Sequence, residues 1–310
     1  MIMIRILFVI LMLFGNTAQA EQSNQGFPRS FQNADGTQTV IPAQPKNILS
    51  TSVTITGTLI AIDAPVTASA TAGDGHFFAQ WASHAKARDI KPLWPVGGVD
   101  TEMAYTVMPD LIVVAKTGGD SVMDYVDELK LIAPVIVLDY GSQPWQALAQ
   151  KLGQALGLED QVALKISEFD RYVDSVHLNI AEPYANVIRY SGPGVANAIA
   201  KSTGPHTQLL SALGFRIEST EEEWETFADR RQDFVRVHYE TLTQLKAPTS
   251  FVIVADRAVA DDVMNDVVLA NVPSVKRRQV YPLGLNSFRI DYYSSLEIIE
   301  LLKQEFGVRE

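Results

Sequence analysis

The chain has 310 residues and is acidic, with 36 Asp and Glu residues against 25 Lys and Arg residues. This balance argues against nucleic acid as the main partner, and a local cluster of basic residues would be needed to attract any anionic ligand. The sequence contains no cysteine, so we expect neither disulfides nor a cysteine-linked lipid anchor, and burial of apolar surface must hold the fold together.

The first twenty residues have the layout of a cleaved secretory signal. Arg5 precedes an apolar run over residues 6–14, and the small-residue sequence Ala18-Gln19-Ala20 follows. The run is too short to span a bilayer as a permanent helix, and no later segment approaches the ~20 apolar residues that a membrane helix needs. We therefore expect a soluble mature chain that starts at Glu21 and is exported to the periplasm of a Gram-negative cell.

The next part of the chain alternates short apolar segments with helical patterns. A hairpin with a turn at Asp35-Gly36 is expected over residues 25–45. Strands are then predicted at 47–49, 66–70, 111–115 and 135–138, and helices at 101–108, 121–131 and 143–156. Such alternation is typical of βαβ units around a parallel sheet.

A long helical stripe interrupts this alternation and ends before Pro183. Its apolar residues are spaced three or four apart: Val162, Ile166, Phe169, Val173, Val176 and Ile180. A second α/β series follows, with strands expected at 185–190, 215–217, 251–255 and 280–282, and helices near 208–213, 239–245 and 294–306. We predict two Rossmann-like lobes with parallel sheets: an N-terminal lobe over 21–158, a connecting helix over 159–182, and a C-terminal lobe with a closing helix over 183–310.

A row of hydroxyl side chains stands where the first strand of the N-terminal lobe meets a helix. The row consists of Ser50, Thr51, Ser52 and Thr54. Such side chains can cap the helix, or they can face the crevice at the strand ends where open α/β sheets bind ligands. The sequence leaves both interpretations open.

Motifs of enzymes and metal sites are hard to find in this sequence. It contains no G-x-S-x-G elbow, Walker loop, G-x-G-x-x-G or H-E-x-x-H, and residues 118–121 (GGDS) are interpreted as a turn that leads into a helix cap. The five histidines are scattered, with none paired at ligand spacing, so direct metal binding is not expected. An exported α/β hydrolase, the remote alternative, would need a nucleophile with a positioned His, which no segment presents.

Four segments carry a resemblance to a known family: STSVTITGTLIAIDAPV at 50–66, MPDLIVVAKTGGDS at 108–121, QVYPLG at 279–284 and FRIDYYSS at 288–295. They resemble, in the same order, the iron-siderophore substrate-binding proteins of ABC importers, in particular those for ferric enterobactin. The resemblance runs from about residue 31 to the last helix and is weak between 185 and 233. It implies a class III periplasmic binding protein, with the ligand held between two lobes, no enzymatic activity and no cofactor. The siderophore, and not the protein, would hold the iron.

The resemblance also implies two docking residues for the membrane permease. Glu102 stands seven residues before Pro109-Asp110, as a glutamate does in the N-terminal lobe of the family, and Glu240 occupies the counterpart in the C-terminal lobe. In the family these carboxylates engage permease arginines. The alternative is that each Glu interacts only with the N-terminus of its own helix. We expect a monomer whose partners are a ferric catecholate siderophore and an inner-membrane ABC permease.

A ferric tris-catecholate is a bulky trianion with aromatic faces, so it calls for Arg and Lys donors and for aromatic rings. Arg289 matches the pocket arginine of the family. The basic candidates at strand ends or in the loops there are Lys116, Arg189, Arg230, Arg231, Arg257 and Arg289. The aromatic candidates are Tyr190, Trp224 and Tyr292. Each charge could instead be solvated or paired, and each ring could instead pack in the core.

A second hypothesis keeps the fold and changes the ligand to haem, cobalamin or a hydroxamate siderophore. Haem would require a Tyr or His axial ligand, for which Tyr292, Tyr293 and His206 are available. The basic residues at the strand ends favour an anion over these ligands.

Overall fold

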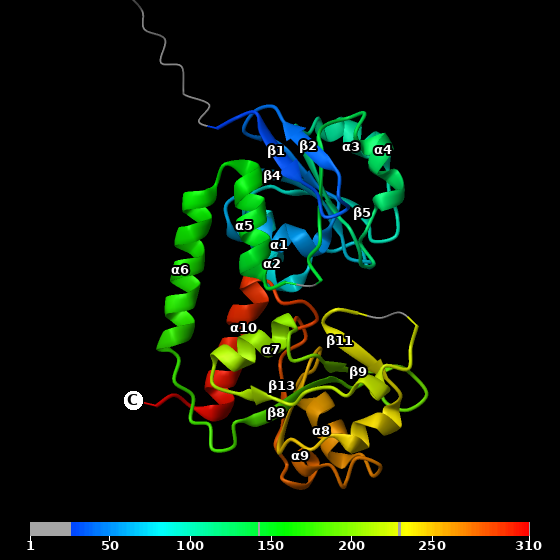
Figure 1. The fold of residues 1–310 in the computed structure, drawn as a ribbon, viewed down its shortest axis with the longest axis vertical. Coiled ribbons are helices and arrows are strands. Elements are labelled where there is room, and N and C mark those ends of the chain that lie inside the picture. The colour runs from blue at the N-terminus through cyan, green and yellow to red at the C-terminus, as the bar shows by residue number, and fades with distance from the viewer. Residues whose placement is uncertain (1–25, 142, 229–230, 310) are drawn as a thin grey trace, which may run out of the picture.

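The computed structural model describes residues 26–141, 143–228 and 231–309. The expected signal sequence and the ligand candidate Arg230 lie outside these ranges. Figure 1 shows two lobes one above the other, with α6 (Glu159–Ser175) running along one side from the upper, N-terminal lobe to the lower one. Among the described residues, no helix has the length and apolar character needed to cross a membrane.

The N-terminal lobe is built on a five-stranded parallel sheet in the order β5-β4-β3-β6-β7. Its strands are β3 (Ile48–Ser50), β4 (Val66–Thr71), β5 (Lys91–Pro95), β6 (Leu111–Ala115) and β7 (Val135–Leu138). The helical elements are α1 (Val53–Ala61), α2 (Ala79–Ala87), α3 (Thr101–Val107), η1 (Met123–Tyr125), α4 (Val126–Leu129) and α5 (Trp145–Leu156). All five residues of β6 are buried, as expected of a central strand covered by helices on both faces.

The expected hairpin lies beside the outer strand of this sheet. Strands β1 (Arg29–Gln32) and β2 (Gln38–Ile41) pair antiparallel, and the turn between them contains Gly36 with a φ of +90°, which favours glycine. The Ala34 N–H donates to the Val137 carbonyl at 2.9 Å, so the hairpin is tied to β7.

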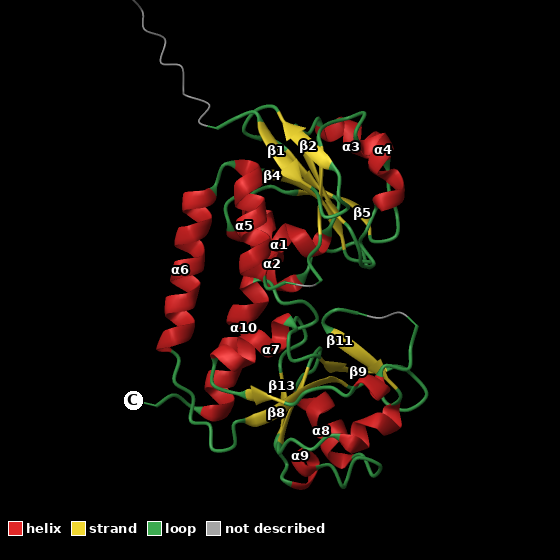
Figure 2. Ribbon diagram, viewed as in Figure 1, coloured by secondary structure: helices red, strands yellow, loops and turns green. Residues whose placement is uncertain are grey.

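The C-terminal lobe contains a six-stranded mixed sheet in the order β11-β9-β8-β12-β13, with β10 paired to β8. Its strands are β8 (Tyr184–Arg189), β9 (Asn197–Ala200), β10 (Arg216–Ile217), β11 (Phe234–Val237), β12 (Thr249–Val252) and β13 (Val280–Pro282). The helical elements are α7 (Pro205–Ala212), η2 (Glu222–Trp224), η3 (Tyr239–Gln244), α8 (Arg257–Asn265), α9 (Pro273–Lys276) and α10 (Tyr292–Phe306). Figure 2 shows the strands of each lobe flanked by helices.

One strand of this sheet, β9, departs from the purely parallel arrangement that the sequence predicts. β9 pairs antiparallel with both β8 and β11. The cause is the short connection between β8 and β9, which turns through Gly192 and Gly194, both at positive φ. A connection of that length can join antiparallel strands, whereas parallel neighbours need a longer crossover.

The connecting helix is shorter than the sequence predicts. α6 ends at Ser175, and Val176 already has an extended backbone with φ −90° and ψ 107°. Leu178 then forms a β-bridge with Val308, close to the C-terminus. Val176 and Leu178 are both buried, so the apolar spacing continues past the end of the helix in an extended segment.

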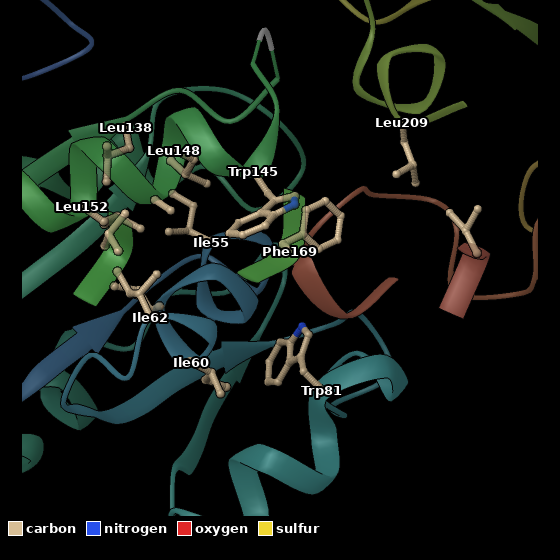
Figure 3. Packing of buried hydrophobic residues seen from close by; sticks show 14 of the residues in the cluster. Ile55, Ile60, Ile62, Trp81, Leu138, Trp145, Leu148, Leu152, Phe169 and Leu209 are labelled. Atoms are coloured by element: carbon tan, nitrogen blue, oxygen red, sulfur yellow. The ribbon is translucent and has the colours of Figure 1, made fainter. Parts of the chain in front are cut away.

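The two lobes share a continuous apolar core where α10 meets the N-terminal lobe. The ring of Tyr292 lies 5.3 Å from that of Trp145, and Trp145 in turn packs edge-on against Phe169 of α6, as Figure 3 shows for the latter pair. A Cβ on Gly57 of α1 would lie 2.8 Å from the carboxylate of Asp291 and from the ring of Trp81. Gly57 therefore permits the close approach of α1 to the start of α10.

Candidate ligand-binding site

A pocket of about 300 Å³ in the C-terminal lobe brings four arginines together. They are Arg189, Arg231, Arg236 and Arg289, and the wall also contains Asp233, Phe234 and Phe288. Like charges in one place repel each other, and an anionic ligand relieves that repulsion. The pocket is therefore suited to an anion.

The register of the sheet explains why two of these arginines meet. Arg189 at the end of β8 pairs with Ala198 of β9, and Arg236 of β11 pairs with the same Ala198 from the other side. Residues paired across strands point to the same face of a sheet. The small side chain of Ala198 thus leaves open space between two guanidinium groups.

Phe288 presents an aromatic face between two guanidinium groups. The Cζ atoms of Arg189 and Arg289 lie 5.5 Å and 4.7 Å from the centre of its ring. The Phe288 side chain is 39% exposed although it is large and apolar. The pocket thus offers both cations and a partly exposed aromatic ring, the two features that suit an anionic aromatic ligand.

Arg289 stands at the boundary between the lobes. Its Nη1 lies 3.1 Å from the Asp233 carboxylate, and its Cζ lies 5.1 Å from the ring centre of Tyr140, which follows β7 of the N-terminal lobe. The Arg289 and Asp233 side chains are 17% and 8% exposed, so this ion pair is largely desolvated. A narrow crevice that continues from the pair is lined by Thr54, Tyr140, His206 and Asp291.

The hydroxyl row at residues 50–54 is mostly buried. Ser50, Thr51 and Ser52 have at most 1% of their surface exposed. The Ser52 hydroxyl caps α1 by accepting a hydrogen bond from the Ile55 N–H at 3.2 Å. Of the four side chains, Thr54 lines the crevice. Helix capping is thus the role that the structure gives Ser52.

Two other basic candidates lie away from the four-arginine pocket. Lys116 is exposed, and its Nζ donates to the Ala34 carbonyl of the hairpin at 2.9 Å. Arg257 donates to both carboxylate oxygens of Glu305, near the end of α10, at 2.7 Å. The structure therefore brings Arg189, Arg231 and Arg289 together and leaves Lys116 and Arg257 outside.

The three aromatic candidates pack within the protein. Trp224 is 7% exposed and its Nε1 donates to the Gln244 side chain at 2.9 Å. The Tyr190 hydroxyl donates to Asp266 at 2.6 Å, and Tyr292 packs on Trp145 as described above. Trp224 is buried and the two tyrosines are partly buried against the core, which is the packing alternative that the sequence left open.

Four residues of the site did not stand out in the sequence: Tyr140, Asp233, Arg236 and Phe288. Phe288 could have been found from the sequence only because it precedes the predicted ligand-binding residue Arg289. Arg236 interrupts the apolar strand FVRV, but only the strand order places it beside Arg189. Asp233 reaches Arg289 only through the folding of the C-terminal lobe, and Tyr140 only through the assembly of the two lobes.

Both predicted docking glutamates are exposed, one in each lobe. Glu102 lies in the first turn of α3, whose N-cap Asp100 accepts a hydrogen bond from the Met103 N–H at 2.9 Å. Glu240 lies in η3, a 3₁₀ helix in place of the α-helix expected at 239–245.

Comparison with known proteins identifies the family. Residues 48–285 match the family model described as periplasmic binding protein. The chain belongs to this family. This periplasmic binding protein is 34% identical over 292 residues to the ferric enterobactin-binding periplasmic protein FepB of Escherichia coli O6:H1, covering 90% of this chain and 91% of FepB.

Solved structures agree with this assignment. The crystal structure of holo-ViuP matches with a TM-score of 0.87 and 49% identity over 90% of this chain and 95% of ViuP. Staphylococcus aureus SirA complexed with staphyloferrin B matches with a TM-score of 0.69 and 18% identity, over 91% of this chain and 99% of SirA, and at that identity it shows the fold alone. The predicted class III fold is confirmed, and so is the prediction of a substrate-binding protein rather than an enzyme.

Proposed function

We propose that this periplasmic binding protein captures a ferric catecholate siderophore of the enterobactin kind and delivers it to an inner-membrane ABC importer. The observation that carries the proposal is the grouping of four arginines around the exposed ring of Phe288. A ferric tris-catecholate has three negative charges and flat aromatic rings, and guanidinium groups suit both features. The 34% identity to FepB, which is named for ferric enterobactin, supports the same ligand class.

The three candidates for an axial haem ligand do not line the four-arginine pocket. Tyr293 stacks on His84 with ring centres 4.5 Å apart, and Tyr292 packs against Trp145. His206 is buried, with its Nε2 2.6 Å from the Ser287 carbonyl. Cobalamin and the hydroxamate siderophores lack the trianionic charge that four arginines would neutralise. These points favour a catecholate.

The proposal is tested by fluorescence quenching of the purified mature protein. Ferric enterobactin, a ferric hydroxamate, hemin and cobalamin are titrated separately, and visible spectra with hemin are recorded. We expect saturable quenching at the lowest concentration with ferric enterobactin. Tight binding of hemin or cobalamin, with no saturable response to any ferric catecholate, would contradict the proposal.

We further propose that residues 1–20 direct export to the periplasm, and that a monomer docks on the permease through Glu102 and Glu240. The exposure of one glutamate on each lobe supports two-point docking. The double variant Glu102→Ala with Glu240→Ala should abolish siderophore uptake by cells and leave ligand binding unchanged. A matched control replaces two other exposed glutamates, Glu128 and Glu223, by alanine. Unchanged uptake in the first variant, or loss of ligand binding, would show that the docking roles are misassigned.

A further inference from the structure

The hydroxyl group of Tyr140 packs against the glycine-rich turn at residues 118–121. Gly118 has a φ of +103°, and a Cβ there would lie 1.8 Å from the Tyr140 oxygen. The Tyr140 hydroxyl uses this space to donate a hydrogen bond to Asp120 Oδ1 at 2.6 Å. The turn therefore does more than lead into a cap, because its first glycine lets Tyr140 reach Asp120.

Asp120 is itself fixed at the N-terminus of α1. Its side chain is buried, and Oδ2 accepts hydrogen bonds from the Ser52 hydroxyl at 2.5 Å and from the Thr54 N–H at 3.1 Å. The N-terminus of a helix favours a negative charge at this position. Burial and the nearby Asp120 charge raise the pKa of Tyr140 well above its usual range, so the hydroxyl remains protonated and continues to donate.

The ring of Tyr140, held in this way, faces the guanidinium of Arg289 from the opposite lobe. Arg289 touches three groups: the ring of Phe288 at 4.7 Å, the ring of Tyr140 at 5.1 Å and the carboxylate of Asp233 at 3.1 Å. Phe288 and Asp233 belong to the same lobe as Arg289. Tyr140 comes from the N-terminal lobe and so links the orientation of this arginine to that lobe.

We propose that Tyr140, locked by Asp120, is a positioning residue that holds Arg289 in its ligand-binding orientation across the lobe boundary. The proposal rests on the proposed function, since Arg289 must bind the anionic ligand. An arginine that is already ordered costs less conformational entropy when the ligand binds. Tyr140 thus increases the affinity through Arg289, and its hydroxyl need not touch the ligand.

A double-mutant cycle tests this role. Dissociation constants for ferric enterobactin are measured for the wild type, Tyr140→Phe, Arg289→Gln and the double variant. Tyr140→Phe keeps the ring and removes the hydroxyl, while Arg289→Gln keeps a donor for Asp233. We expect Tyr140→Phe to weaken binding about fivefold, in line with the cost of ordering one long side chain. In the Arg289→Gln background the same change should have no further effect.

The matched control is Tyr172→Phe, because the Tyr172 hydroxyl on α6 also donates to a carboxylate, that of Glu300. This variant should bind ferric enterobactin like the wild type. The inference is overturned if Tyr140→Phe binds as tightly as the control, or if its loss of affinity is the same with and without Arg289. A wild type that does not bind ferric enterobactin refutes the proposed function itself and, with it, this inference.

Discussion

Replacing Arg189 by alanine should weaken the binding of ferric enterobactin by about tenfold to a hundredfold. Arg189 ends β8, lines the pocket, and lies 5.5 Å from the Phe288 ring centre. A hydrogen bond to a charged group contributes about 1.5–3 kcal/mol when its removal leaves the partner unsatisfied. Each ~1.4 kcal/mol corresponds to a factor of ten in the dissociation constant. The assay is fluorescence quenching, with thermal unfolding of the same samples to verify that the variant is folded.

The informative counterpart is Arg257→Ala, because the sequence offers both Arg189 and Arg257 as basic candidates near strand ends. The Arg257 side chain is 54% exposed and is paired with Glu305, outside the pocket. An exposed pair of this kind contributes about 0–1 kcal/mol to stability, so the variant should unfold at nearly the same temperature. Its affinity for ferric enterobactin should equal that of the wild type. Equal losses in the two variants, or a larger loss for Arg257→Ala, would refute the assignment of the pocket.

Further predictions concern the lobe boundary. Gly57→Ala should lower the free energy of unfolding by about 1 kcal/mol. Overpacking costs typically ~1–3 kcal/mol, which outweighs the gain of roughly 1 kcal/mol in helix propensity. An unchanged or higher unfolding temperature would contradict this prediction. Burial raises the pKa of Asp291 to about 6, so acidification from about pH 6 to about 4 protonates the folded state first and adds stability. Burial lowers the pKa of His206 to about 4, so below about pH 6.5 the unfolded chain is protonated first and stability is lost. Urea titrations at pH 7 and 4.5 measure how the free energy of unfolding changes on acidification. Compared with the wild type, Asp291→Asn should lose more of this free energy at the lower pH, and His206→Gln should lose less. Identical changes in all three proteins would show that neither pKa shift exists.

The alternation of strands and helices could be predicted because local patterns determine it. The run LIVVA at 111–115 is β6 with the expected bounds, since a strand buried on both faces has a continuous apolar sequence. The end of α6 could not be predicted in the same way, because Leu178 is buried in an extended segment that pairs with Val308, far away in the sequence. The spacing of apolar residues indicates which residues are buried, and residues after the end of α6 are still buried although they are no longer helical.

The site was only partly accessible from the sequence, for a similar reason. A strand end indicated Arg189 and the resemblance to the family indicated Arg289, and both line one pocket. Arg236 joins them through the register of β8, β9 and β11, which no local pattern encodes. Arg257 also follows a strand, β12, but it pairs with Glu305, 48 residues further along the chain. The tertiary fold thus decides which strand-end cations reach the pocket.

A crystal structure of the protein with ferric enterobactin tests the central claim most directly. The account predicts the iron complex against Phe288, with catecholate oxygens within hydrogen-bond distance of Arg189 and Arg289. A second cavity, a groove of about 450 Å³ between α5, α6 and α7, is lined by Trp145 and Phe169. A siderophore seated in that groove, with the four arginines free of it, would contradict the account.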